Sequence, residues 1–83
     1  MKLSDGAIGK RYFVKEINLA MAARRRLEIL GMTGNAKVDI LNSKRSGTKI
    51  IKVRGTRFAL GSEFAKGIEV EELQMQTGGQ INE

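Results

Sequence analysis

The stretch RRRLEILGM, residues 24–32, sets three arginines against an apolar run that stops at a glycine. It belongs to a longer segment, LAMAARRRLEILG at residues 19–31, in which residues that favour helices dominate. Asn18 is suited to the N-cap of a helix there, and Gly31 is suited to its C-terminal end. The segment therefore predicts one α-helix, and the question is what its arginines face.

Two faces of this helix differ in character. At helical spacing, four apolar residues share the face that should pack on the rest of the domain: Leu19, Ala23, Leu27 and Leu30. Met21, Arg25 and Ile29 share a roughly opposite face, and because protein interfaces favour Met and Arg, they resemble a contact patch. The alternative is that they lie idle in water, since single exposed apolar residues are ordinary. The candidate partner-binding residues are Met21, Arg25, Ile29 and, just past the helix, Met32.

Short apolar segments separated by turn signals surround the helix. Strands are expected at residues 9–18 (with a bulge or bent end), 36–42, 48–55, 56–61 and 68–73. A single helical turn with Ser62 as N-cap is expected at residues 62–67. The aromatic residues occupy positions where a core needs bulk: Tyr12, Phe13, Phe58 and Phe64. This pattern predicts a mainly β fold, a small closed or nearly closed barrel of about five strands, because closure removes exposed strand edges.

The totals fit one small soluble domain. The chain has 83 residues, 41% hydrophobic and 29% charged, with no cysteine to form a disulfide. No apolar run approaches the roughly 20 residues needed to cross a bilayer, and the N-terminus lacks the apolar core of a signal peptide. We expect a domain at residues 1–73, a flexible polar tail at 74–83 and a cytoplasmic location.

Charge is unevenly spread along the chain. All fifteen Lys and Arg lie in residues 1–66 beside five acids, a net charge of +10, whereas residues 67–83 carry four acids and no base. A basic body attracts nucleic acid, an anionic membrane surface or an acidic protein patch, and charge alone does not choose among them. The nucleic-acid alternative would use a basic groove on the barrel, built from Lys49, Lys52, Arg54 and Arg57. Its stacking platforms are scarce, because aromatic residues make up only 5% of the chain.

The sequence contains few residues suited to catalysis or metal binding. The chain has no histidine and no cysteine, which removes the commonest general base, a common nucleophile and the two best transition-metal ligands. Neither a phosphate-binding loop nor a dinucleotide fingerprint occurs. Glu69 and Glu71 project from one side of the last expected strand, where two carboxylates are usually solvated rather than metal-bound. The sequence thus predicts a protein that is not an enzyme and holds no cofactor or metal.

Four stretches of the chain carry motifs that, taken in order, are typical of one small protein family. The helix end matches at Arg26, Leu27, Leu30, Gly31 and Met32. The strand–turn–strand VRGTRFAL matches at Val53, Arg54, Gly55, Ala59 and Leu60. The closing SEFAKGIEV matches at Glu63, Ala65, Ile68 and Val70, and the opening LSDGAIGKR at Leu3, Ser4, Asp5 and Gly9. Together these motifs resemble the FeoA family, the small cytoplasmic components of bacterial ferrous iron uptake. Where the family tends to have Thr-Pro-Gly, this chain has Thr33, Gly34 and Asn35, and Asn tolerates the left-handed conformation that Gly would take.

The resemblance implies an SH3-like β-barrel with a helix inserted between its first two main strands. It also implies a protein partner, the FeoB membrane transporter for Fe²⁺, which carries a cytoplasmic G-protein domain. FeoA-like domains also end iron-dependent repressors of the DtxR type, where they serve as protein–protein modules. The expected function is therefore a non-enzymatic accessory role in iron uptake, exercised by binding the cytoplasmic part of the transporter. A nucleic-acid-binding barrel and a weak homo-oligomer built by pairing barrel edges are the competing possibilities.

Overall fold

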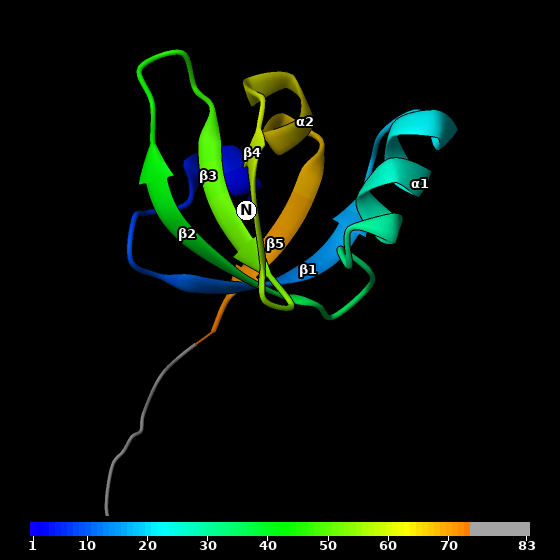
Figure 1. Ribbon diagram of the computed structural model, residues 1–83, viewed down its shortest axis with the longest axis horizontal. Helices are drawn as coiled ribbons and strands as arrows, with labels where there is room; N and C mark the ends of the chain where they lie inside the picture. The colour runs from blue at the N-terminus through cyan, green and yellow to red at the C-terminus, as the bar shows by residue number, and fades with distance from the viewer. Residues whose placement is uncertain (74–83) are drawn as a thin grey trace, which may run out of the picture.

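Five antiparallel strands curl into a small barrel in the computed structural model, which describes residues 1–73 (Figure 1). The strands are β1 (Arg11–Ile17), β2 (Lys37–Ser43), β3 (Lys49–Val53), β4 (Thr56–Leu60) and β5 (Ile68–Glu72). Their order across the sheet is β4-β3-β2-β1-β5. The helices are η1 (Leu3–Asp5), α1 (Met21–Ile29) between β1 and β2, and α2 (Ser62–Lys66) between β4 and β5. The predicted fold class is confirmed, while the tail predicted at residues 74–83 lies outside the described residues.

Strand alternation builds the core. Successive side chains of a strand point to opposite faces, so every second residue of β2 and β3 enters the barrel. The buried apolar residues of these strands are Val38, Ile40, Ile51 and Val53. They include every apolar core position predicted there except Ala36, which is buried just before β2. In β1 the pairing register to β5 shifts between Val14 and Glu16, which confirms the predicted bulge and lets Val14 and Ile17 both face inward.

The two ends of the sheet are finished differently. Along β5, the Val70 N–H donates to the Met1 carbonyl at 2.7 Å, and Lys2 forms a bridge to Glu69, so this edge is covered by the start of the chain. At the other end, β4 pairs with β3 through a two-residue turn. Arg54 and Gly55 in that turn have φ of 50° and 83°, as a type I′ hairpin turn requires.

Helix α1 is shorter than the predicted span of residues 19–31, and its N-cap is Ala20 rather than Asn18. The Asn18 N–H instead donates to the Gly67 carbonyl at 2.7 Å, which ties this segment to the junction of α2 and β5. Leu19 packs so closely there that a Cβ on Gly67 would lie 2.4 Å from its side chain. Tertiary contact therefore holds residues 18 and 19 out of the helix. The N-cap of α2 is likewise Gly61 rather than the predicted Ser62.

The C-terminal end of α1 is a Schellman motif. Gly31 has φ of 101°, the Gly31 N–H donates to the Glu28 carbonyl at 3.0 Å, and the Met32 N–H donates to the Leu27 carbonyl at 2.9 Å. Leu27 and Met32 are both buried, as the apolar contact of this motif requires. Asn35 has φ of 66°, so the left-handed residue expected after the helix is also found.

We predict that Gly31→Ala lowers the free energy of unfolding by about 1–2 kcal/mol, because a side chain disfavours the left-handed conformation. The added Cβ would also lie 2.9 Å from the Arg54 side chain. Gly34→Ala is the control, since no atom lies within 4 Å of the Cβ position there. Urea denaturation of both variants makes the comparison, and equal stability of the two would contradict this account of the helix end.

Candidate functional site

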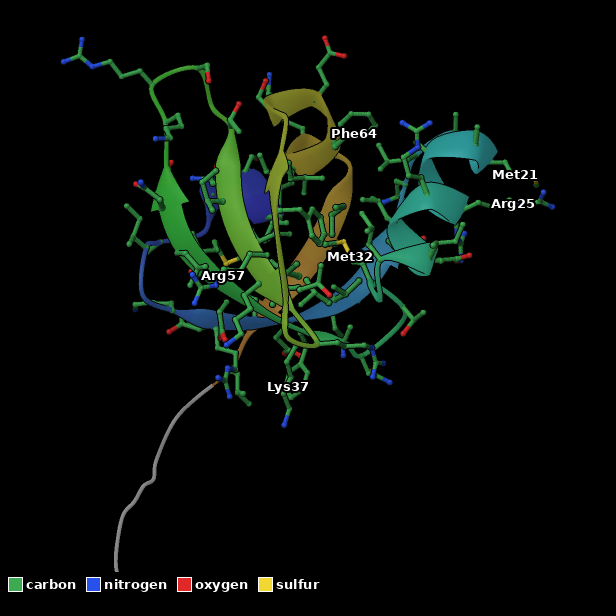
Figure 2. All side chains as sticks on the ribbon, in the orientation of Figure 1. Met21, Arg25, Met32, Lys37, Arg57 and Phe64 are labelled. Atoms are coloured by element: carbon green, nitrogen blue, oxygen red, sulfur yellow. The ribbon has the colours of Figure 1, made fainter. Side chains whose placement is uncertain are left out.

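The three consecutive arginines of α1 have three different environments. The Arg24 Nε donates to Glu28 Oε2 at 3.1 Å, one turn further along the helix. Arg25 points away from the barrel and forms no ion pair with any residue from 1 to 73 (Figure 2). Arg26 lines a hollow between the helix and the rest of the domain. The three arginines therefore differ in role: the first pairs within the helix, the second lies on the outer surface, and the third borders a hollow on the inner side.

The outer face of α1, defined here as Met21, Arg25 and Ile29, is strongly exposed. Met21 has 68% of its surface accessible and Ile29 has 85%, both high for apolar side chains. Figure 2 shows Met21 and Arg25 pointing away from the barrel. The geometry agrees with the shared face expected from the sequence, and its binding role stays a prediction.

Met32 does not belong to this surface, although the sequence placed it among the partner-binding residues. It is completely buried, and Figure 2 shows it beneath α1 on the barrel side. The left-handed Gly31 reverses the chain direction, so the residue after it turns inward against Leu27 rather than continuing along the helix. Helical spacing predicts which residues share a face only within the helix, and Met32 lies beyond its end.

The inner face of α1 borders a groove that the sequence did not reveal. Leu27 is buried, while Ala23 and Leu30 are half-buried. Two adjoining hollows of about 190 and 210 Å³ share Ala23, Arg26 and Phe64. We call this the α1–β4 groove, and its lining is Ala22, Ala23, Arg26, Leu27, Leu30, Phe58, Ala59, Leu60, Gly61 and Phe64.

Phe64 was expected in the core, and that expectation is wrong. Its side chain is 42% exposed, on the short helix α2 at one end of the groove (Figure 2). A helix of five residues buries one narrow face, and Ala65 is the residue that takes it. The exposed ring next to an apolar hollow is the signal that points to the groove.

The basic groove proposed for nucleic acid does not form as expected. Lys49 is buried, and its Nζ donates to Ser43 Oγ at 2.9 Å and to the Gly6 carbonyl at 3.3 Å. Arg54 is held by the helix end, where its Nε donates to the Gly31 carbonyl at 3.0 Å. Lys52 and Arg57 remain on the outer surface, directly opposite each other on β3 and β4.

A row of charged side chains crosses the outer face of the sheet. The pairing register aligns Arg11 with Asp39, Asp39 with Lys52, and Lys52 with Arg57. The Arg11 guanidinium donates to both Asp39 carboxylate oxygens, and this raises the pKa of Arg11 above its ordinary value. The row therefore reads base, acid, base, base, and ends at the open edge of β4.

The acids of β5 are used in ion pairs. Glu69 lies 3.1 Å from the Met1 amine, and Glu71 lies 3.5 Å from Lys15 Nζ. Across residues 1–73, no three His, Cys, Asp or Glu side chains gather as metal ligands. In the same part of the chain, no helix combines the length and apolar character needed to span a bilayer.

Comparison with known families assigns the chain. A family model described as the FeoA domain matches residues 1–72. The chain belongs to the FeoA family. This agrees with the four motifs, because all of them lie within the matched residues. No curated protein matches significantly.

Solved structures of FeoA proteins share the fold. The solution structure of FeoA from Chlorobium tepidum is 32% identical, with a TM-score of 0.84, over 94% of this chain and 75% of that one. A crystal structure of an iron uptake regulatory protein, FeoA, is 34% identical, with a TM-score of 0.81, over 88% of this chain and 97% of that one. FeoA of Stenotrophomonas maltophilia, complexed with zinc, is 28% identical, with a TM-score of 0.69, over 86% and 89%. That protein is described as a prokaryotic SH3 domain protein and a candidate ferrous iron transport activating factor.

Substitutions on the two faces of α1 should differ greatly in their effect on the free energy of unfolding. Leu27→Ala should lower the free energy of unfolding by about 2–5 kcal/mol, because it leaves a cavity where a buried side chain packs. Ile29→Ala should change it by less than about 0.5 kcal/mol, since the side chain is in water. Thermal and urea denaturation test both, and a large loss for Ile29→Ala would show that this face is packed.

Proposed function

We propose that this FeoA-family chain is a non-enzymatic accessory protein of ferrous iron uptake that works in the cytoplasm. It binds the cytoplasmic part of the FeoB transporter and modulates the assembly or activity of that transporter. The observation that carries the proposal is the outer face of α1, where Met21 and Ile29 are largely exposed around Arg25. Membership of the FeoA family supports a role in ferrous iron transport, and the transporter is the partner that we propose for that role.

The outer face of α1 has the chemistry of a protein contact. Burying an exposed isoleucine stabilises a complex by roughly 1.5–3 kcal/mol, which is enough for one residue to matter. Arg25 forms no ion pair within residues 1–73, so its guanidinium is available to a carboxylate of the partner. Arg24, by contrast, is already paired with Glu28 along the helix.

Binding of this kind acts by shifting a conformational equilibrium. A protein that binds one state of the transporter's cytoplasmic part more tightly than another increases the population of that state. The effect is limited to the difference between the two affinities, so it needs no residue of this chain to touch nucleotide or iron. Docking on FeoB would bring the protein to the inner face of the membrane without inserting it.

We expect Ile29→Glu and Arg25→Glu each to weaken binding to the FeoB cytoplasmic region by about tenfold or more, or about 1.4 kcal/mol. Calorimetric titration with FeoB from the same organism, with nuclease present, measures this. The matched control is Ile8→Glu, because Ile8 is also an exposed isoleucine, at 56%, but precedes β1 rather than lying on α1.

The titration separates two failures. Wild-type affinity for Ile29→Glu would remove the outer face of α1 from the interface while leaving the partner intact. Absence of binding by the wild-type protein would overturn the proposed function itself. Binding that appears only without nuclease would favour the nucleic-acid alternative.

A further inference from the structure

Strand β4 has an open edge. It is the terminal strand of the sheet, paired on one side with β3. No backbone hydrogen bond from any other described element reaches Thr56–Leu60, whereas the opposite end of the sheet is covered by Met1 and Lys2. An uncovered edge presents free N–H and C=O groups that another strand can pair with.

The turn fixes which groups of β4 are free. In a two-residue hairpin, the residues flanking the turn form a hydrogen-bonded pair, here Val53 with Thr56. Because hydrogen-bonded and non-hydrogen-bonded pairs alternate, Arg57 and Ala59 direct their N–H and C=O groups away from β3. These are the groups that an added strand would use.

The free edge faces the α1–β4 groove. Ala59 lines the hollow of about 190 Å³ together with Leu27 and Leu30 of the helix. Its side chain, like that of Arg57, lies on the outer face of the sheet, while Phe58 packs against the core. A segment lying along β4 would thus place every second side chain against apolar residues and the others outside.

Neither of the two bases next to this edge, Lys52 and Arg57, forms an ion pair within residues 1–73. Lys52 and Arg57 are directly opposite each other, and like charges across a strand pair destabilise it. One position further along the row, beyond Arg57, a carboxylate would give Arg57 an acidic neighbour, as Asp39 is for Arg11. Arg26 adds positive charge to the groove, and no acidic residue of the described chain lines it.

We propose that the α1–β4 groove is a strand-addition site for an extended segment of a protein partner in which apolar residues alternate with Asp or Glu. The segment pairs with Arg57 and Ala59 of β4, places its apolar side chains against Leu27, Phe58 and Phe64, and sets a carboxylate beside Arg57. Such main-chain pairing gives affinity, and the alternate side chains give specificity.

Other occupants fit less well. A helix has no free backbone groups for the edge, and hollows of about 190 and 210 Å³ take single side chains rather than a cylinder of about 10–12 Å. A second copy pairing β4 with β4 would bring two Arg57 side chains together at an edge that is already basic. The groove and the outer face of α1 are separate surfaces. That the added segment belongs to FeoB rests on the proposed function.

The test uses a synthetic peptide, acetyl-Gly-Val-Glu-Val-Glu-Val-Gly-amide, titrated into the ¹⁵N-labelled protein. We expect saturable binding, with hydrogen exchange of the Arg57 and Ala59 amides slowed by about tenfold or more and that of Phe58 unchanged, because Phe58 already pairs with β3. The same peptide with Lys in place of Glu should bind about tenfold more weakly or not at all.

Two N-methylated versions of the peptide test main-chain pairing without altering the protein. Each version is methylated on one of the two alternating sets of amides. Methylation of the amides that face β4 should abolish binding, while methylation of the other set should not. In the protein, Arg57→Glu and Arg26→Glu should each reduce affinity about tenfold, and Arg45→Glu, in the loop between β2 and β3 and outside the lining of the groove, should not. Ala59→Pro should also abolish binding, because an outward N–H of an edge strand is lost without breaking the sheet.

The results decide each claim separately. No saturable binding up to millimolar peptide, equal affinity of both methylated peptides, or wild-type affinity of Arg57→Glu would overturn strand addition. Dimerisation of the free protein that protects the Ala59 amide would assign the edge to a second copy instead. Titration of the FeoB cytoplasmic region into Arg57→Glu and Ile29→Glu then distinguishes this groove from the outer face of α1, since loss in the second variant alone leaves the proposed function standing.

Discussion

The left-handed conformation of Gly31 is the constraint on which the surface of this molecule depends. It ends α1, turns Met32 into the core against Leu27, and exposes the Gly31 carbonyl to Arg54 of the β3–β4 turn. At its other end, the helix is preceded by the bond from Asn18 to Gly67. The helix is therefore fixed at its two ends and buries only Leu27 against the core, and the α1–β4 groove lies in the space that this leaves.

Much of the fold follows from local rules that the sequence obeys. Alternation places Val38, Ile40, Ile51 and Val53 inside, and the broken alternation of β1 predicts its bulge. Asn35 supplies a left-handed residue where the family tends to have glycine. Each of these inferences needs only the neighbours of a residue in the chain, which is why sequence reasoning reaches them.

The failures share a different cause. Met32 is buried because the chain reverses direction after the helix. Lys49 is buried because Ser43 and the Gly6 carbonyl accept hydrogen bonds from its ammonium group. Phe64 is exposed because α2 is too short to bury a second residue. The late start of α1 depends likewise on Gly67, which is distant in sequence. The groove could not be predicted for the same reason, since its walls come from two segments, residues 22–30 and 58–64, that are distant in sequence and are brought together by the barrel.

The division of the three arginines now has a physical explanation. Consecutive residues of a helix point about 100° apart, so Arg24 meets Glu28 along the helix, Arg25 faces water, and Arg26 borders the groove. A partner that met only the outer face would leave the free edge of β4 exposed, with Lys52 and Arg57 facing each other. A partner that added a strand would neutralise that pair and cover Phe64, while Met21 and Ile29 stayed in water. Because the two surfaces lie on opposite sides of one helix, both can be occupied at once, and the helix can then hold two segments of one partner at a fixed separation.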